Sequence, residues 1–423
     1  MRGNGIEVSG PAAGADAEAA FDGVICIGGE DWWYHNRGHF DFQIMRRIAR
    51  DMPVLFVNSL GVRVPNPLRD RHFSQRIARK LTSYARGLVE AEPGFWVFSP
   101  VVVPGARGKA LTDWALAPQI RLAAHRAGIT NPALWLHCPP GADLIGRIPA
   151  RLTVMQRTDR FEAFPDGDHI TIARQIGAMK QAADLIVYCN DALAAEDSER
   201  PADRMVVTHG VDLERFASAG QKRRATDWAA PDDIAGIPSP RIGFIGGVDH
   251  HTFDPPLFLE VADRIPDAHF VVVGGCSLPS DWVGSRQNIH IVGRKPYDVI
   301  ADYMAAMDVL IMPWNRSDWI AACNPIKLKE YLAVQRPVVT TDFPALGPWR
   351  DRVAVANTAE AFADACREAL SSTAADVSSA LATETWDHKS AAILSRMHML
   401  ATARRDADVA RIPERTRLIP ATA

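Results

Sequence analysis

A short segment near residue 325 combines a helix start with side chains that suit a phosphorylated ligand. Asn324 can cap a helix, and Pro325 suits the first helical position, where a missing N–H costs nothing. The free N–H groups and positive dipole end of such a helix attract a phosphate, and Lys327 adds a full charge in the first turn. Glu330, further along the helix, can reach a hydroxyl group of the same ligand. The segment therefore predicts a site for a nucleoside diphosphate, with Glu330 on the ribose.

Short β-type runs alternate with helical patterns along the chain, which is typical of parallel α/β architecture. The alternation stops at 217–240, a segment rich in Ala, Pro, Asp and basic residues with few periodic apolar positions. We interpret it as a surface linker between two doubly wound domains, 21–216 and 241–384. The predicted strands are 23–27, 54–57, 95–98, 133–136, 152–155, 185–188 and 205–207 in the first domain, and 241–245, 269–273, 289–292, 309–312 and 337–340 in the second.

Each predicted domain opens with a strand that runs into a pair of glycines. Gly28 and Gly29 follow the first strand of one domain, and Gly246 and Gly247 follow that of the other. Glycines at this place let the backbone approach a ligand at the carboxyl edge of the sheet. Neither pair matches GxGxxG, so a Rossmann dinucleotide site is not supported. One pair alone indicates a tight turn, whereas two pairs favour a binding cleft between the domains.

Composition favours a soluble globular enzyme and excludes several other classes. With 423 residues the chain is too long for one core, so two domains are expected. A net charge of −3 gives no general affinity for nucleic acid, and no apolar run reaches the roughly 18 residues that span a bilayer. The six cysteines lack CxxC spacing, so neither a zinc site nor a disulfide framework is indicated. We expect a cytoplasmic protein without a secretion signal and with flexible ends at 1–20 and 403–423.

Motifs in the second half of the chain follow a recognisable order. They are Gly243-Phe-Ile-Gly-Gly247, Val271-Val-Val-Gly-Gly275, Val292-Gly-Arg-Lys-Pro-Tyr297, Ala306-Met-Asp-Val-Leu310 and Asn324-Pro-Ile-Lys-Leu-Lys-Glu-Tyr-Leu-Ala333. In this order they resemble the donor domain of GT-B glycosyltransferases, especially the large retaining family 4 group. The resemblance implies an α/β fold of two Rossmann-like domains that face a central cleft. Residues 206–216 resemble the stretch that closes the first domain of the family, and 385–402 resemble its last helix, which crosses back to that domain.

The resemblance also implies a donor site, from which this chain departs in two places. Family members commonly carry Glu-x7-Glu at the donor helix, but the first Glu position falls on Ala322 here, so a subgroup with Asn-Pro-x-Lys-x-x-Glu-Tyr-Leu is the closer match. The usual Arg and Lys pair after the first strand of the donor domain is replaced by Asp249-His-His251, and His250, His251, Arg294 or Lys295 would supply the missing charge. The implied donor-binding residues are Gly246, Gly247, His250, Arg294, Lys295, Asn324, Pro325, Ile326, Lys327 and Glu330.

The loop after the first predicted strand gathers acidic, basic and aromatic residues before a helix. Aromatic faces pack on sugar rings, and the charged and amide side chains offer hydrogen bonds of both polarities. Trp32 and Trp33 could instead be core anchors, and both interpretations stay open. Since the first domain holds the acceptor in the GT-B family, we expect an acceptor site formed by Glu30, Asp31, Trp32, His35, Asn36 and Arg37.

Two later strand ends of the first domain carry further polar groups. In many family 4 enzymes a His after the corresponding strand faces the donor sugar, but the best positional match here, 156–159, contains none. The resemblance therefore implies Asp159 near the anomeric centre, followed by Arg157 and His137. The implied chemistry is retaining substitution, which requires charge stabilisation at the leaving diphosphate. Neither a metal nor a cofactor is expected, because the donor helix can stabilise the phosphates.

Residues 63–88 form a basic segment with apolar positions at helical spacing. Seven cations stand against one acid, and Phe73, Ile77, Leu81, Tyr84 and Leu88 lie on one side of the predicted helix. The simpler interpretation is a helix whose apolar stripe faces the core. The alternative is peripheral contact with anionic lipid at the inner face of the membrane.

The sequence thus predicts a hexosyltransferase that moves a sugar from a nucleoside diphosphate sugar to a glycan, lipid-linked or small-molecule acceptor. Retention of configuration and a role in polysaccharide, cell-envelope or glycoconjugate biosynthesis follow from the resemblance. A nucleotide-sugar 2-epimerase shares the architecture, but its paired acid and base residues cannot be placed here. A degenerate enzyme that binds a nucleotide or scaffolds a complex is the other alternative, and Ala322 is its main argument.

Overall fold

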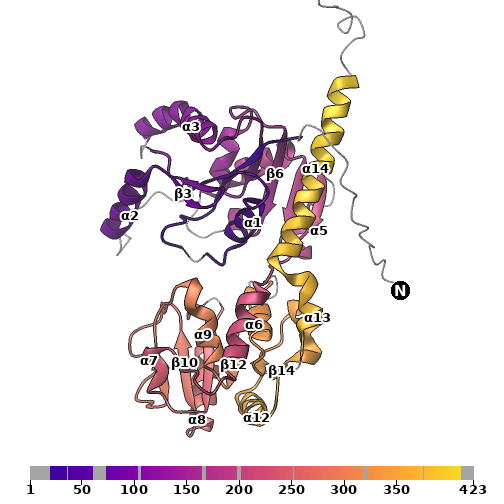
Figure 1. Ribbon diagram of the computed structural model, residues 1–423. Coiled ribbons are helices and arrows are strands. Elements are labelled where there is room, and N and C mark those ends of the chain that lie inside the picture. The colour runs from indigo at the N-terminus through magenta and orange to yellow at the C-terminus, as the bar shows by residue number, and fades with distance from the viewer. Residues whose placement is uncertain are drawn as a thin grey trace, which may run out of the picture.

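The computed structural model shows two α/β domains, one above the other in Figure 1, and a long C-terminal helix that lies along the upper, N-terminal domain. The structure describes residues 20–35, 37–60, 73–102, 106–163, 168–197, 202–250, 252–317, 320, 323–374 and 376–410.

The N-terminal domain contains an eight-stranded sheet in the order β3-β4-β2-β1-β5-β6-β7-β8, and every pair is parallel except β3 with β4. Alternate residues of β1 enter different clusters: Val24 and Cys26 pack with α1 and α14, whereas Ile25 and Ile27 pack with α3. Both faces are covered, which is why the strands are continuous apolar runs. The strands are β1 (Gly23–Ile27), β2 (Val54–Val57), β3 (Leu88–Glu92), β4 (Phe95–Phe98), β5 (Pro132–Leu136), β6 (Leu152–Arg157), β7 (Leu185–Tyr188) and β8 (Asp203–Val206).

The C-terminal domain contains a parallel six-stranded sheet in the order β11-β10-β9-β12-β13-β14. One face packs on α6, α9 and α11, and the other packs on α8 and α12. Figure 1 shows this sheet between its helices below the N-terminal domain. The strands are β9 (Arg241–Ile245), β10 (His269–Val273), β11 (Ile289–Ile291), β12 (Val309–Met312), β13 (Val338–Thr340) and β14 (Ala354–Val355).

Along the chain, helices alternate with these strands in both domains, as expected of doubly wound sheets. The α-helices are α1 (Phe40–Ile48), α2 (Phe73–Arg86), α3 (Ala106–Arg126), α4 (His169–Ala182), α5 (Asp191–Glu196), α6 (Leu213–Lys222), α7 (Asp232–Ala235), α8 (Pro255–Arg264), α9 (Ile300–Ala305), α11 (Ile326–Ala333), α12 (Ala359–Leu370), α13 (Ser378–Leu381) and α14 (Trp386–Ala410); short 3-10 helices are η1 (Pro139–Leu144), η2 (Phe161–Ala163), η3 (Tyr297–Val299), η4 (Pro344–Arg352) and η5 (Ala382–Glu384).

The segment predicted as a surface linker, 217–240, is structured differently. Its first part continues α6, whose Phe216 and Ala219 are buried in the core of the C-terminal domain. Ile234 of α7 belongs to the same core. Gly220 explains the close packing of α6, because a Cβ there would lie 2.2 Å from the carbonyl oxygen of Val334. The segment is therefore part of the second domain, and its few apolar residues are the ones that anchor it.

The chain crosses between the domains twice, and the two crossings are joined to each other. Val211 donates its N–H to Glu384 O at 2.9 Å and accepts the Trp386 N–H at 3.1 Å. The carboxylate of Glu384 accepts from Lys329 Nζ at 2.5 Å and from Lys389 Nζ at 3.0 Å. Because Lys329 lies on α11, this buried cluster ties α11 to both crossings.

The last helix is longer than the predicted 385–402. It continues to Ala410, and Arg404 of this extra part forms a 2.6 Å ion pair with Asp184 of the N-terminal domain. Residues 403–410 of the predicted flexible tail are therefore helical, whereas 411–423 lie outside the described residues, as do 1–19 of the predicted flexible start.

Candidate functional site

The strand order of the N-terminal domain reverses between β1 and β5, and open α/β sheets bind ligands at the carboxyl end of such a point. Gly28 and Gly29 follow β1 there, and His137 follows β5. A Cβ at Gly29 would lie 2.6 Å from the His137 ring, so only glycine allows the imidazole this position. The structure therefore brings one predicted catalytic residue, His137, against the glycine pair.

His137 forms a buried pair with Asp41, in the first turn of α1. Asp41 Oδ2 lies 3.0 Å from His137 Nδ1 and accepts the Gly29 N–H at 3.2 Å, while His137 Nε2 lies 2.9 Å from Thr158 Oγ1. Burial opposes the charged imidazole, but the Asp41 carboxylate raises the pKa of His137 above its ordinary value. Burial also opposes the carboxylate, and the charge and hydrogen bond of His137 lower the pKa of Asp41. Both shifts favour the ionised form of the pair.

The other two predicted catalytic residues follow β6 and differ in their surroundings. The Arg157 guanidinium is buried and forms hydrogen bonds of 2.5 and 2.8 Å to Glu162 and one of 3.0 Å to Asp159 O. It is thus occupied by the segment that follows its own strand. Asp159 is half-buried. The pKa of Cys323 is raised to about 11, first by the burial of the thiol and second by the negative charge of Asp159. Its carboxylate is therefore within electrostatic reach of the segment just before α11.

The predicted acceptor residues divide into three groups. Glu30 and His35 form a 2.9 Å ion pair with each other. Asp31 accepts a 2.9 Å hydrogen bond from Ser83 of α2. Trp32 is 2% exposed and packs between Phe42 and Phe95, so it is a core residue and offers no face to a sugar.

Arg37 completes this loop and reaches the other domain. Its guanidinium lies 4.6 Å from the centre of the Trp32 ring, and Nη1 is 3.7 Å from Asp298 of the C-terminal domain. Asn36 lies outside the described residues. The loop is therefore organised by its own ion pairs, and Arg37 brings it to the domain boundary.

The strand order of the C-terminal domain reverses between β9 and β12, with Gly246 and Gly247 at the carboxyl end of β9. The backbone is crowded there, because a Cβ on Gly274 would lie 1.7 Å from Gly246 O. The Tyr331 hydroxyl accepts the Ile245 N–H at 2.8 Å and donates to Ile245 O at 3.2 Å. Tyr331 thus fixes α11 against the end of β9, at the point where a ligand is expected.

Helix α11 begins one residue later than predicted. Pro325 occupies the N-cap with extended backbone angles, so Asn324 lies outside the helix and no side chain caps it. The first N–H groups of α11, beginning at Ile326, are left without a capping side chain, and Ile326 itself packs against a hydrophobic cluster of the N-terminal domain. The helix start therefore lies at the domain boundary.

The two charged residues predicted on this helix contact each other. Lys327 Nζ lies 2.9 Å from Glu330 Oε2, and the Glu330 side chain is almost wholly buried while that of Lys327 is partly exposed. The pKa of the Tyr297 phenol is raised, first by its burial and second by the nearby carboxylate of Glu330. Ala322, at the position of the missing first Glu, lies outside the described residues.

The remaining predicted donor residues lie on different sides of the C-terminal sheet edge. Arg294 is exposed and lies over Gly275 at the end of β10, and among the described residues no carboxylate pairs with it. Lys295 instead pairs with Asp233 of α7 and lies 5.5 Å from the Tyr303 ring. The exposed His250 accepts a 3.0 Å hydrogen bond from Asn315 through its backbone oxygen. His251 lies outside the described residues.

Together these contacts give the two sheet edges different chemistry. The C-terminal edge offers free backbone N–H groups, the Lys327 ammonium and the Arg294 guanidinium, which suit an anion. The N-terminal edge offers a hydrogen-bonded His137 and a half-buried Asp159, which suit hydroxyl groups.

Comparison with known proteins agrees with this arrangement. Residues 239–372 match the family described as Glycosyl transferases group 1. A Bacillus subtilis (strain 168) protein named as a teichuronic acid biosynthesis glycosyltransferase, TuaH, is 32% identical over 174 residues. The matched stretch covers 39% of this chain and 42% of that relative, less than half of each.

Solved structures of two-domain enzymes share the fold over most of the chain. Sucrose-phosphate synthase from Thermosynechococcus elongatus has 14% identity and a TM-score of 0.55, and the alignment covers 91% of this chain and 97% of that one. HepE from Anabaena, solved in complex with UDP-glucose, has 13% identity and a TM-score of 0.53, with 92% and 99% covered. The fold is GT-B. The family match of the C-terminal domain supports a group 1 glycosyltransferase.

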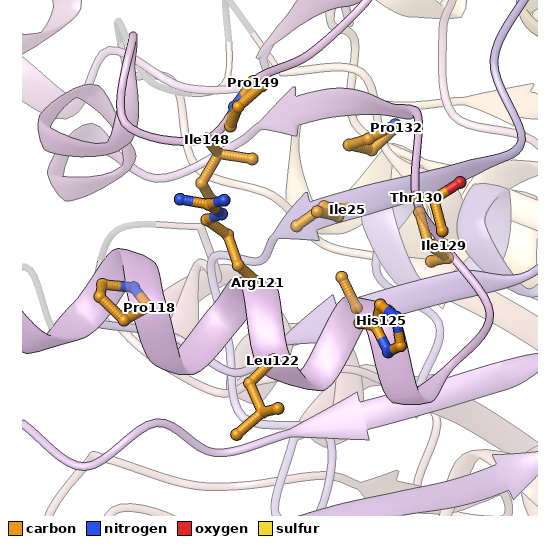
Figure 2. A pocket seen from close by; sticks show the side chains of 11 residues that line it. Ile25, Pro118, Arg121, Leu122, His125, Ile129, Thr130, Pro132, Ile148 and Pro149 are labelled. Atoms are coloured by element: carbon orange, nitrogen blue, oxygen red, sulfur yellow. The ribbon is translucent and has the colours of Figure 1, made fainter.

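A separate cavity lies at the opposite edge of the N-terminal sheet. It has a volume of about 440 Å³ and lies between α3 and the start of β5, as Figure 2 shows. Arg121 and His125 of α3 border it together with Ile129, Thr130 and Pro132. Because β1 and β5 both run away from this edge, the cavity is remote from the sheet edge that carries His137.

Proposed function

We propose that this GT-B protein is a hexosyltransferase that moves a sugar from a nucleoside diphosphate sugar to a glycan, lipid-linked or small-molecule acceptor. The observation that carries the proposal is the uncapped start of α11 at the domain boundary, with Lys327 in its first turn and Arg294 unpaired nearby among the described residues. The structural neighbour HepE was solved with UDP-glucose bound, and the Bacillus relative is named for teichuronic acid biosynthesis. The first supports a donor of this class, and the second supports a role in polysaccharide, cell-envelope or glycoconjugate biosynthesis.

In the proposed mechanism the C-terminal edge stabilises the leaving group. Negative charge develops on the diphosphate as the glycosidic bond breaks, and fixed N–H dipoles and cations already aimed at it require no reorganisation. The α11 N–H groups and Lys327 would hold the phosphates, and Glu330 would contact the ribose after exchanging its Lys327 partner. Retention follows if the acceptor hydroxyl attacks from the side of the leaving diphosphate, which then takes its proton.

The N-terminal edge would position the transferred sugar. Asp41 fixes the orientation of the His137 ring, so Nε2 can hydrogen-bond a sugar hydroxyl in place of Thr158. Asp159 reaches toward α11 and would contact the sugar near its anomeric carbon. Arg157 would act on the sugar only indirectly, by holding the segment that contains Asp159 through its bond to Asp159 O.

Incubation with a panel of nucleoside diphosphate sugars, without acceptor, tests the proposal. Slow release of nucleoside diphosphate from one donor is the expected result, because water replaces the missing acceptor. Interconversion of the sugar would instead identify a nucleotide-sugar 2-epimerase. Binding of a nucleotide with neither reaction would favour a catalytically degenerate scaffold, and absence of both binding and reaction would contradict the donor site.

A further inference from the structure

Helix α2 presents an uncharged apolar face to solvent. Ile77 is 41% exposed and Leu81 is 61% exposed, one turn apart on the same face. Ala78, Thr82 and Ala85 on the adjoining positions are exposed as well. A helix on a domain surface normally turns its apolar stripe inward, as the simpler interpretation of the sequence predicts. Here that interpretation is wrong for the two large side chains, Ile77 and Leu81.

The inner side of α2 is polar because it packs on the predicted acceptor loop. Ser83 is fully buried and donates to Asp31 at 2.9 Å, and Lys80 donates to Ser59 O at 2.8 Å. Arg86 lies 4.3 Å from the Trp33 ring centre, and Arg79 lies 5.5 Å from that of Tyr34. Polar contacts on the inside therefore force the apolar residues to the outside.

Two further segments of the same domain carry exposed apolar side chains. The Tyr84 hydroxyl of α2 lies 3.5 Å from Val102 O, and Val101 is held by a 3.0 Å bond from its N–H to Gln119 of α3. Val101 is 52% exposed, and Trp114 of α3 is 75% exposed. Figure 1 shows α2 and α3 on the side of the N-terminal domain away from α14. We call Ile77, Leu81, Val101 and Trp114 the α2–α3 surface.

The charge around this surface is positive. Helix α2 has no acidic residue and α3 has one, Asp113; Arg79 and Arg86, whose guanidinium groups lie over rings of the acceptor loop, are themselves exposed. Arg121 and Arg126 of α3 are exposed too. Scattered large apolar side chains and a tryptophan bordered by arginines are the pattern of interfacial membrane helices, in which arginines meet lipid headgroups.

We propose that the α2–α3 surface docks on an anionic bilayer. Docking would place the lipid surface beside the acceptor loop, because the opposite side of α2 contacts that loop through Asp31 and Trp33. This deepens the proposed function by favouring a lipid-linked acceptor, but the docking itself needs neither a donor nor catalysis. The two proposals can therefore fail separately.

Cosedimentation of the full chain with vesicles tests the docking. Vesicles of phosphatidylcholine with about one third phosphatidylglycerol should bind the wild-type protein at low salt, and vesicles of phosphatidylcholine alone should bind it much less. Raising the salt to about 0.5 M should weaken the binding, because screening shortens the reach of the arginines. Leu81→Glu and Trp114→Glu should each lower vesicle affinity by about tenfold or more, since each removes a large apolar contact. Met399→Glu is the matched control, because Met399 is an equally exposed apolar residue (58%) on α14 and should change nothing.

Thermal unfolding should be unchanged in all three variants, because the replaced side chains already face water. Wild-type protein that stays in the supernatant at low salt would overturn the proposal. An equal loss of vesicle binding in Met399→Glu would also overturn it. A protein that binds no vesicles and forms a dimer in solution, which Leu81→Glu dissociates, would show that the surface is a contact between two copies of the chain. Release of nucleoside diphosphate, measured without vesicles, should be the same in Leu81→Glu and in the wild type. If the protein binds vesicles but turns over no donor, the proposed function is refuted and the docking proposal stands.

Discussion

The two sheet edges that meet at the domain boundary handle charge in opposite ways. At the N-terminal edge three ion pairs join side chains of the same domain: Asp41 with His137, Arg157 with Glu162, and Glu30 with His35. At the C-terminal edge Lys327 and Lys295 are paired as well, with Glu330 and Asp233, but the first N–H groups of α11 have no side-chain cap and Arg294 has no carboxylate partner among the described residues. The two edges therefore differ in these uncapped N–H groups and this one guanidinium, which leave the second edge able to attract an anion.

This difference assigns separate tasks to the two domains. Side chains that are already paired keep their geometry when a ligand binds. They can form hydrogen bonds to uncharged hydroxyl groups, but these bonds add little electrostatic binding energy. An edge with uncapped N–H groups and an unpaired guanidinium gains most when an anion binds. Substitutions at the first edge should therefore act mainly on stability, and substitutions at the second mainly on anion affinity.

The largest effect is expected from Asp41→Ala. The carboxylate is fully buried, and its removal leaves His137 without its counter-charge, so we expect a loss of about 3–5 kcal/mol in the free energy of unfolding. Urea denaturation followed by circular dichroism measures it. Asp233→Ala, which breaks the exposed pair with Lys295, should change little. If the two substitutions lowered the free energy of unfolding equally, the N-terminal edge would not be the one that a buried ion pair stabilises.

Lys327→Ala should act on anion binding. Loss of one charged contact to a phosphate is worth about 1.5–3 kcal/mol, so affinity for a nucleoside diphosphate should fall by roughly ten- to a hundredfold in calorimetric titration. Lys295→Ala is the matched control, because its ammonium is held by Asp233.

Lys327→Ala also leaves Glu330 buried and unpaired, which would lower stability by itself. The double variant Lys327→Ala with Glu330→Gln removes that charge. It should regain stability without regaining affinity. Recovery of affinity in the double variant would mean that Lys327 serves only to neutralise Glu330.

A smaller effect is expected from Arg294→Ala. Since the side chain is exposed and has no carboxylate partner among the described residues, unfolding should change by less than about 0.5 kcal/mol. Affinity for the nucleoside diphosphate should fall about fivefold, because the site is open to water. Arg286→Ala, at a cation already paired with Asp263, should leave affinity unchanged. Unchanged binding in both variants would place the phosphates away from β10.

The smallest effect concerns pH. The pKa of His137 is raised in the folded state, so its contribution to stability is present below its unfolded pKa of about 6.5 and is lost as pH rises through the folded value. The pKa of Asp41 is lowered, so its contribution is present above about 3.8 and is lost as pH falls through the folded value. The free energy of unfolding between pH 5 and 9 should therefore decline toward alkaline pH in the wild type, and the His137 part of the decline should vanish in Asp41→Asn. Parallel curves would show that Asp41 does not set the His137 titration.

Local patterns were enough to predict much of the fold. The apolar runs of β1, β9 and β12 are buried on both faces, and the glycines after β1 and β9 stand at the two points where strand order reverses. Both properties depend on neighbouring residues and on general rules for parallel sheets. The edge strands β3 and β14 were not predicted, because β3 alternates with acids and β14 has only two residues.

The site could be predicted only where one segment supplies it. Lys327 and Glu330 lie one turn apart on a single helix, so spacing alone indicates that they act together. Asp41, His137 and Thr158 come from three elements and meet only after folding; the one local signal was an acid between Phe40 and Phe42 at a helix start. Tyr331 likewise needs β9 beside it, and the outward apolar face of α2 depends on what its polar side contacts.

The decisive experiment is a crystal structure with the cognate nucleoside diphosphate sugar bound. We expect the diphosphate on the N–H groups at the start of α11 with Lys327 beside it, the ribose at Glu330, and the sugar directed toward His137 and Asp159. The same structure would show which group occupies the place of the first Glu, where this chain has Ala322. A diphosphate bound at the N-terminal edge, or a donor that leaves α11 uncontacted, would contradict the division of tasks between the two domains.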